Sequence, residues 1–492
     1  MKGIPEIASE RCSARKHPYI NCRFRNRKDK AGPVRRVWPS AGPPDRALPA
    51  RFFLPTILPG LLIAAFLILA NPFGVRNARA QMVSGRFMTT FYSYQQYDTS
   101  NNAKLSLRGF EAMQLNFGSG NYQLHTYLLA TNDFMTQLPN DPLLRAANLY
   151  FEARNIAKIF DLKLGRQPVF SRVGVSSFDG LSAGAKLFDD KISLFAFGGA
   201  LPPMNERIEL NTDLKDNMLY GGEAYYSPFD NFRIGGAYVN KNFKPPSYYA
   251  YRLSESFNTP GAQDSILISP DAIANRFVSG DLSYFTDNLS GYFRLDYDLN
   301  LYDIDRTIVS FRYSPFASFS ANVGYYHRTS NLPYNSIFSV FDHSGTDELD
   351  LGASYLFTQD ISAFGSYDRI FYTGANSNQF TVGTNIYLFT LSFSHNDGFA
   401  GNLNGVNAQV IYPFMNQRFV LIASASATDY KVLQQLTSAN RLYNGALGVT
   451  YRPLKLLAIT LQGQYYQDPV FKNDLRGYLQ VNYYFFKNFS GN

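Results

Sequence analysis

The last alternating stretch of the chain decides the fold. Residues 475–485 read Leu-Arg-Gly-Tyr-Leu-Gln-Val-Asn-Tyr-Tyr-Phe. Successive side chains of a β-strand point to opposite faces, so Leu, Gly, Val and Tyr gather on one face and Arg, Gln and Asn on the other. The pattern predicts a strand with one lipid-like face and one wet face.

The same alternation recurs almost without pause from Met82 onward, and no amphipathic helix of convincing length interrupts it. Residues 289–297, 443–451 and 457–465 repeat it clearly. In the first of these, Arg294 and Asp296 fall on the polar face only. That face would meet bulk water in a soluble sandwich, whereas in a barrel it lines the lumen.

The links between the alternating segments distinguish these two architectures, because short and long links alternate along the chain. Short links are predicted at 118–120, 155–157, 189–191, 228–231, 286–288, 315–318, 358–360, 413–417 and 453–455. Longer links are predicted at 134–145, 167–178, 200–216, 241–274, 329–347 and 428–441. Tight turns on one rim and long loops on the other are typical of outer-membrane barrels.

We therefore predict an all-β fold, a transmembrane antiparallel up-and-down β-barrel of about 22 strands. Two places leave the count open: the tight turn near Tyr387 and Leu388, and the mixed pattern from Arg108 to Asn116. Roughly 16 to 20 strands also fits the ordinary uncertainty of strand boundaries. Strands begin within a few residues of Gln81, so no plug domain is expected before them.

The first 80 residues differ in composition from the rest. Residues 52–70 read FFLPTILPGLLIAAFLILA and lead to Ala78-Arg79-Ala80, which predicts a signal peptide over 51–80, cleaved before Gln81. A transmembrane anchor is the alternative. Residues 1–50 form a basic extension without periodicity, and a translation start at Val37 or Leu48 would remove much of it. The barrel is assigned to 81–492.

Charge and cysteine content exclude several classes of protein. The chain carries a net charge of +8. Residues 1–80 hold 15 of the 46 Lys and Arg and 4 of the 38 Asp and Glu, which leaves 31 basic against 34 acidic residues and a net charge of −3. We therefore expect no nucleic-acid partner. Cys12 and Cys22 both precede Gln81, so the barrel needs no disulfide.

Two short stretches resemble known barrels. Residues 483–489 at the end of the chain resemble the C-terminal strand that the barrel-assembly machinery binds, although the chain continues past Phe485. Leu162-Lys163-Leu164-Gly165-Arg166-Gln167 is similar to a strand end, before an extracellular loop, that is common in porin-like and polysaccharide-export outer-membrane β-barrels. The resemblance implies a porin-type channel of the outer membrane, with Arg166 near the loop-side mouth.

Strand parity gives a set of candidate pore-lining residues with charges of both signs, which predicts weak ion selectivity. Each charge is also explained by ion pairs within the wall. The candidates are Glu152, Asp161, Lys163, Arg166, Glu223, Arg233, Asp281, Arg294, Asp296, Arg312 and Arg476.

The long loop from Asn240 to Asn275 is the candidate constriction loop, expected to fold inward and narrow the lumen. Its basic and aromatic residues could filter sugars or anions, and the alternative is a surface loop packed on its neighbours. The residues are Lys244, Tyr248, Tyr249, Tyr251 and Arg252.

A porin-like channel for passive diffusion of small hydrophilic solutes or oligosaccharides is the function these features favour. A polysaccharide export conduit or a surface-interaction barrel is the alternative, which the sequence does not separate from it. An outer-membrane hydrolase is least favoured, because no motif fixes a geometry around His343 or the other histidines. We expect no enzyme, cofactor or metal site; the lipid of the outer membrane is the expected surrounding, and the oligomeric state stays open.

Overall fold

A computed structural model of the chain describes residues 81–97, 102–135, 143–171, 174–253, 263–329, 345–399, 401–431, 440–469 and 473–489. Residues 1–80 lie outside this part, and so do the predicted signal peptide and the basic extension. His343 also lies outside the described residues.

The described part of the chain is built from β-strands. Their bounds are β1 (Gln81–Tyr97), β2 (Ala103–Ser119), β3 (Tyr122–Asp133), β4 (Leu143–Ile156), β5 (Phe160–Ser171), β6 (Gly174–Leu187), β7 (Ile192–Ala200), β8 (Met218–Phe229), β9 (Phe232–Phe243), β10 (Tyr248–Leu253), β11 (Gln263–Ile268), β12 (Ile273–Phe285), β13 (Leu289–Asp298), β14 (Asp303–Phe316), β15 (Phe319–Arg328), β16 (Thr346–Thr358), β17 (Ile361–Tyr372), β18 (Ala375–Ile386), β19 (Phe389–Gly398), β20 (Asn402–Phe414), β21 (Phe419–Lys431), β22 (Asn440–Leu454), β23 (Leu457–Gln467) and β24 (Asp474–Asn488). No helix in the described ranges is long and apolar enough to cross a membrane.

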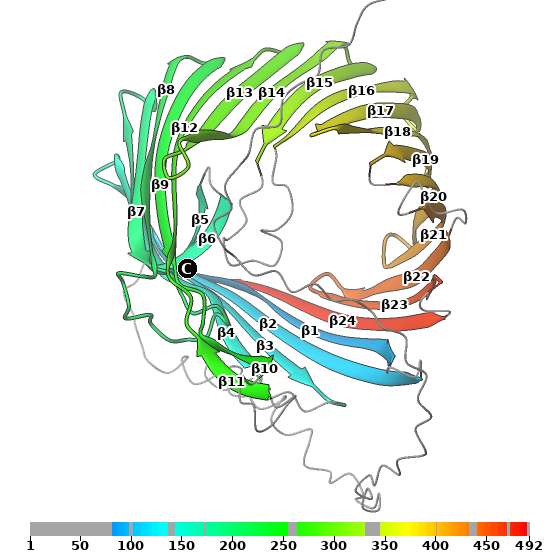
Figure 1. Ribbon diagram of the computed structural model, residues 1–492, viewed down its shortest axis with the longest axis horizontal. Helices are drawn as coiled ribbons and strands as arrows, with labels where there is room; N and C mark the ends of the chain where they lie inside the picture. Colours follow the sequence, from blue (N-terminus) through cyan, green and yellow to red (C-terminus); the bar gives the residue numbers. More distant parts are fainter. Residues whose placement is uncertain are drawn as a thin grey trace, which may run out of the picture. The chain divides into compact units, whose positions relative to one another are not determined.

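The main sheet closes on itself. Each strand pairs antiparallel with its neighbour in sequence order, β9 pairs with β12, and β24 pairs with β1 (Figure 1). The resulting sheet has 22 strands, which confirms the predicted antiparallel up-and-down barrel and its count rather than the smaller alternative. Closure leaves no open edge to lipid. β10 and β11 form a separate two-stranded sheet, and no plug domain is present in the described part.

The short links of one rim fall where the sequence predicts them. Turns follow Ser119, Ile156 and Leu187, and the turn at Tyr387 and Leu388 is also present. The other rim carries the longer links, but four of its links are short as well, at 172–173, 299–302, 373–374 and 399–401.

The predicted long link at 167–178 is wrong. β5 and β6 continue as a paired hairpin up to the register pair Ser171 and Gly174. Antiparallel pairing within the hairpin supplies its backbone hydrogen bonds, although the sequence around Pro168 and the serines lacks the alternation of the other strands.

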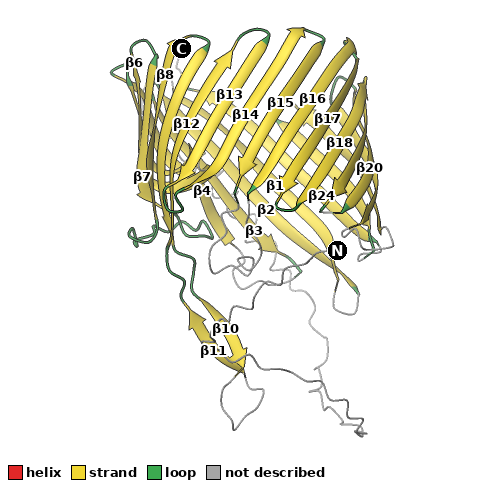
Figure 2. Ribbon diagram, turned by 45° about the horizontal axis from the view of Figure 1, so that its top comes forward, coloured by secondary structure: helices red, strands yellow, loops and turns green. Residues whose placement is uncertain are grey.

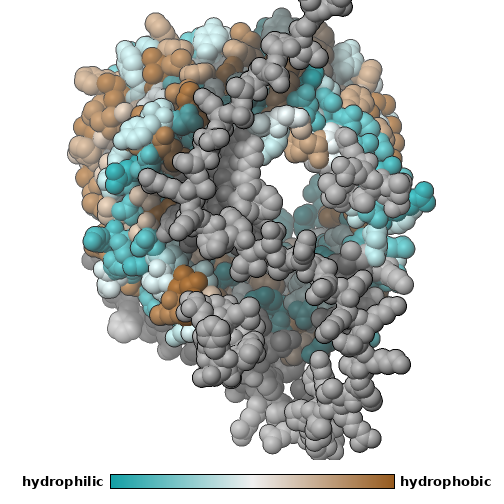
Figure 3. Space-filling model, viewed as in Figure 1, coloured by the Kyte–Doolittle hydropathy of each residue, from teal (hydrophilic) through white to brown (hydrophobic). Residues whose placement is uncertain are grey.

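The two faces of the barrel differ as the alternation predicts. On β24, Leu479 and Val481 point outward, and Gln480 and Asn482 point inward. Figure 3 shows hydrophilic residues beside the opening of the barrel and hydrophobic residues over its outer surface. Water fills a polar lumen at no cost, whereas polar groups that face lipid are costly.

A candidate pore narrowed by an inward hairpin

The tip of the β5–β6 hairpin leaves the barrel wall. Pairing between β4 and β5 ends at Leu149 and Arg166, and pairing between β6 and β7 ends at Asp179 and Ala200. Residues 167–171 and 174–178 therefore have only each other as strand partners among the described residues. We call residues 167–171 and 174–178 the hairpin tip.

The hairpin tip lies inside the lumen against β7, β8 and β9. Val169 and Phe178 pack in one cluster with Phe197, Leu219 and Val239, and Phe178 is 0% exposed. Phe197, Leu219 and Val239 occupy inward-facing positions of the wall. Lys241, also inward-facing, donates from Nζ to Ser176 Oγ at 3.2 Å. The tip thus gives this side of the lumen a small hydrophobic core.

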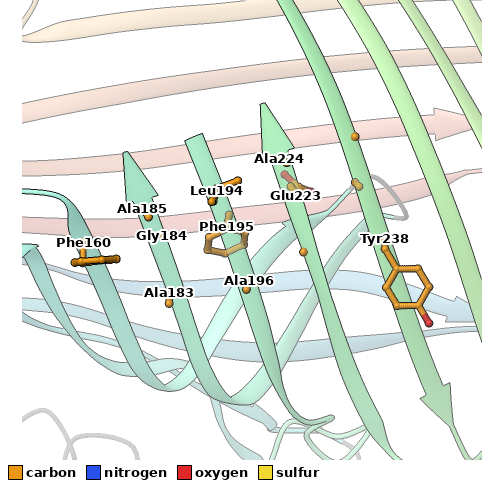
Figure 4. Close-up of a pocket in the computed structure, with 13 residues that line it drawn as sticks. Phe160, Ala183, Gly184, Ala185, Leu194, Phe195, Ala196, Glu223, Ala224 and Tyr238 are labelled. Atoms are coloured by element: carbon orange, nitrogen blue, oxygen red, sulfur yellow. The ribbon is translucent and has the colours of Figure 1, made fainter. Parts of the chain in front are cut away.

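The part of the wall that the hairpin tip covers carries bulky residues on its inner face and several small residues on its outer face. Outward positions of β6 to β8 carry Ala183, Ala185, Ala196 and Ala224, which leave a shallow outer groove of about 500 Å³ (Figure 4). Phe195, by contrast, points inward and packs against the cluster. The wall here therefore carries a packed core on its inner face, while Leu194 and Tyr238 still point outward and line the groove.

Glycines allow the hairpin to bend away from the wall. Gly165 has a φ of 120°, a region that L side chains rarely adopt. Gly180 and Gly199 are register partners, and a Cβ on Gly180 would come within 2.7 Å of Gly199 Cα. β6 and β7 therefore approach each other where β6 turns inward.

Arg166 and Asp179 hold the base of the hairpin. Arg166 Nε donates to Asp179 Oδ1 at 2.7 Å, and Nη2 donates to Oδ2 at 2.8 Å. Arg166 is 6% exposed. Bidentate arginine–carboxylate pairs combine charge with fixed orientation.

The same guanidinium anchors the β7–β8 loop. Nη1 donates to the carbonyl oxygens of Glu206 and Arg207 at 3.2 and 2.7 Å, and Nη2 donates to that of Glu209 at 2.8 Å. The backbone N–H of Ala146 on β4 donates to Glu206 at 3.0 Å. The loop therefore bonds to the edge of β4 that β5 leaves unpaired.

Glu152, on the inward face of β4, is the centre of a charged cluster. Its carboxylate lies 2.8 Å from Arg154 Nη2, 3.5 Å from Lys163 Nζ and 3.0 Å from His125 Nε2. The Glu152 side chain is only 5% exposed. Asp161 accepts the N–H of Asn155 at 2.8 Å, at the adjoining turn. The charges of this cluster thus neutralise one another.

A second charged group lies on β12 and β13. Arg294 donates to both carboxylate oxygens of Asp296 at 2.7 and 2.6 Å, and Ser279 also bonds to Asp296. Asp281 is buried on the inward face of β12, in register with Arg294.

The other predicted pore-lining residues are dispersed around the lumen. Glu223 accepts the Tyr225 hydroxyl at 2.9 Å, and Arg233 lies 4.9 Å from the centre of the same ring. Arg312 donates to Ser320 at 2.9 Å. Arg476 donates to Asp474 and lies 4.5 Å from the centre of the Tyr466 ring. All take inward positions in their strands, and the structure gathers them into no single site.

The residues of the predicted constriction loop lie at or beside the β10–β11 hairpin. Figure 2 shows this hairpin extending past the ends of the barrel strands. Tyr248 and Tyr249 are exposed, and Tyr251 and Arg252 belong to β10. Lys244 Nζ lies 2.9 Å from Asp216 Oδ2, and this hydrogen bond raises the pKa of Lys244. Its role as a constriction stays a prediction.

Sequence reasoning missed the hairpin tip, although two signals for it exist. Phe195, Phe197, Leu219 and Val239 fall on the inward, polar-parity face of their strands. A run of apolar residues on that face indicates a cover inside the lumen. Paired glycines in adjacent strands, Gly180 with Gly198-Gly199, are the second signal.

The closed sheet, apolar outside and polar inside, is the architecture of an integral outer-membrane β-barrel. Within the described ranges, no group of three or more His, Cys, Asp or Glu is placed to hold a metal ion.

Solved structures with a related shape share little sequence with the chain. The P pilus usher (PapC) translocation pore is 11% identical, with a TM-score of 0.44, and the match covers 82% of this chain and 99% of that one. A BenF-like porin from Pseudomonas fluorescens Pf-5 is 10% identical, with a TM-score of 0.40, over 83% and 99%. The outer membrane protein OpdK from Pseudomonas aeruginosa is 9% identical, with a TM-score of 0.37, over 83% and 99%. No family model and no curated protein matches the chain.

Proposed function

We propose that the chain is an outer-membrane channel through which small hydrophilic solutes diffuse passively. The hairpin tip inside the lumen is the observation that carries this proposal. A barrel of 22 strands encloses a wide lumen. A rigid segment that narrows the lumen without filling it produces a size limit, which a channel in a protective membrane needs.

The hairpin tip is suited to narrowing the lumen because it is held in two places, at its apolar face and at its base. Its apolar face is buried in the cluster of Val169 and Phe178, and its base is fixed by the Arg166–Asp179 pair. A segment with a packed face and a buried ion pair keeps one position, so the narrowed passage has a fixed width. Phe170, on the opposite face of the hairpin from Val169, is 74% exposed.

The charges along the lumen favour a passage of low ion selectivity. Glu152 is compensated by basic neighbours, and Arg294 and Arg476 each have an acidic partner. Paired charges contribute little net field to the passage, so permeation depends on size more than on charge.

Single-channel recording in planar bilayers tests the proposal. The purified folded protein should give uniform conductance steps in KCl, and polyethylene glycols of increasing mass should stop entering the pore above a size limit. Heat-unfolded protein from the same preparation is the control. Folded protein that gives no steps would contradict the channel function and favour a surface-interaction role.

A further inference from the structure

One side of the lumen carries almost no charge. At the inward-facing positions of β18 to β23, the described residues include a single charged side chain, Arg452, next to the turn between β22 and β23. We call the inward face of β18–β23 the neutral wall. Charged residues do occur on these strands, but at outward positions: Asp397, Asp429, Lys431 and Arg441.

The neutral wall is polar nevertheless. Amide side chains point inward from several of its strands, with hydroxyl groups between them. The amides are Gln379, Asn385, Asn396, Asn407, Gln409, Asn444, Gln462 and Gln464. Amides and hydroxyls both donate and accept hydrogen bonds, as the hydroxyl groups of a sugar do. An ion, by contrast, is held by charges or by a full shell of carbonyl oxygens.

Only some of the amide and hydroxyl groups of the neutral wall form hydrogen bonds with one another. Thr381 and Ser394 bond at 3.1 Å, and Thr450 and Thr460 bond at 3.0 Å. These bonds link hydroxyls of adjacent strands. Gln379 and Asn407 are exposed to the lumen. Their amide groups can therefore bond to a solute without breaking the wall.

Tyrosines border the neutral wall along β23, β24 and β1. Tyr466, Tyr478, Tyr92 and Tyr94 take inward positions, and the rings of Tyr92 and Tyr94 stack with centres 5.4 Å apart. A tyrosine ring offers an apolar face ending in a polar hydroxyl. A pyranose ring has the same combination, with C–H groups on its faces and hydroxyls at its edge.

The other side of the lumen differs from the neutral wall because it carries many charged side chains. Charges occupy inward positions on β3 to β5 and on β12 to β17, and several are paired, as Glu152 with Arg154 and Arg328 with Glu348. A solute that follows the neutral wall avoids them. Any charge on the solute would gain no partner there and would lose part of its hydration.

We propose that the neutral wall is a track for uncharged polyhydroxylated solutes, that is, neutral saccharides. The inference rests on the proposed channel function and names its substrate class. Weak hydrogen bonds repeated along one wall bind a solute tightly enough for it to enter the channel and loosely enough for it to leave.

The test measures the block of single-channel KCl current by maltohexaose, a neutral glucose hexamer, and by an oligogalacturonate of the same length. Maltohexaose should block with measurable affinity, and the acidic oligomer should block weakly. Each of Gln409→Ala and Gln462→Ala removes one hydrogen-bonding group, which should weaken the maltohexaose block about fivefold with little change in KCl conductance.

Gln123→Ala is the matched control, because it removes the same amide from an inward position of β3, beside Glu152 on the charged side. Its maltohexaose block should equal that of the unaltered protein. An open channel that maltohexaose does not block, or one that the acidic oligomer blocks better, would overturn the substrate class while leaving the channel function intact. A folded protein without conductance would instead contradict the channel function.

Discussion

Arg166 and Asp179 face each other on β5 and β6 at the point where both strands leave the barrel wall, joined by hydrogen bonds of 2.7 and 2.8 Å. The remaining donors of Arg166 reach the β7–β8 loop. One guanidinium therefore fixes both the hairpin and the β7–β8 loop. That loop bonds to the edge of β4 where β5 no longer pairs with it.

Replacing Arg166 should loosen the hairpin. Arg166→Ala leaves Asp179 as a buried carboxylate without its cation, which should lower the free energy of unfolding by about 3 kcal/mol. Urea unfolding in lipid vesicles measures this. Arg166→Ala combined with Asp179→Ala removes the stranded charge and should recover part of the loss. Equal losses in the single and double variants would argue against the pair as the cause.

The close approach at Gly180 should tolerate no side chain. Gly180→Ala places a Cβ against the backbone of β7, which should cost about 1–3 kcal/mol of stability. Gly463→Ala is the control, since a Cβ there meets nothing within 4 Å. Unfolding transitions of the two variants should therefore differ, with the loss confined to Gly180→Ala. Identical transitions would contradict a tight contact at the base of the hairpin.

Glu152 should matter for the charge balance of the lumen. Glu152→Gln leaves Arg154 and Lys163 without their carboxylate partner, but both cations are partly exposed, so stability should fall by only about 1 kcal/mol, and anions should permeate more readily. The reversal potential in a KCl gradient measures the second effect. Glu223→Gln, whose carboxylate accepts a tyrosine hydroxyl, is the control and should change both quantities less. An unchanged reversal potential for Glu152→Gln would show that the charges of this cluster do not influence ion permeation.

Glu111 is a carboxylate on the outward face of β2. It accepts a hydrogen bond from Thr89 at 2.7 Å, and the outward residues on either side of it along the strand include Met113 and Leu107. A charged group facing lipid is unfavourable, so Glu111→Leu should raise stability by about 1 kcal/mol in vesicles. Glu111→Gln separates the loss of charge from the gain of apolar surface. A loss of stability in Glu111→Leu would show instead that the hydrogen bond from Thr89 outweighs the cost of a carboxylate that faces lipid.

Much of the fold follows from the sequence because lipid imposes one rule on every strand. Outward residues such as Leu479 and Val481 must be apolar, and inward residues such as Gln480 are free to be polar. That rule gives the strands, their faces and the turns between them. The alternation on either side also predicts the turn at Tyr387 and Leu388, which the structure confirms.

The hairpin tip could not be placed in the same way. Val169 and Phe178 pack on residues of other strands, and such tertiary contacts leave no period within the segment itself. The resemblance at residues 162–167 put Arg166 near the loop-side mouth of a pore. Its buried bonds to Asp179 and to the β7–β8 loop depend on how three connections fold together, which the sequence alone does not specify.

The central claim is that the hairpin tip narrows an open passage. The most direct measurement compares the single-channel conductance of the unaltered protein with that of a variant in which residues 167–178 are replaced by an Asn-Gly turn, which suits a tight hairpin between Arg166 and Asp179. Folding of both proteins is checked by the shift of the unheated band in gel electrophoresis. The account predicts a larger conductance and entry of larger polyethylene glycols in the variant. A folded variant with the conductance and size limit of the unaltered protein would contradict it.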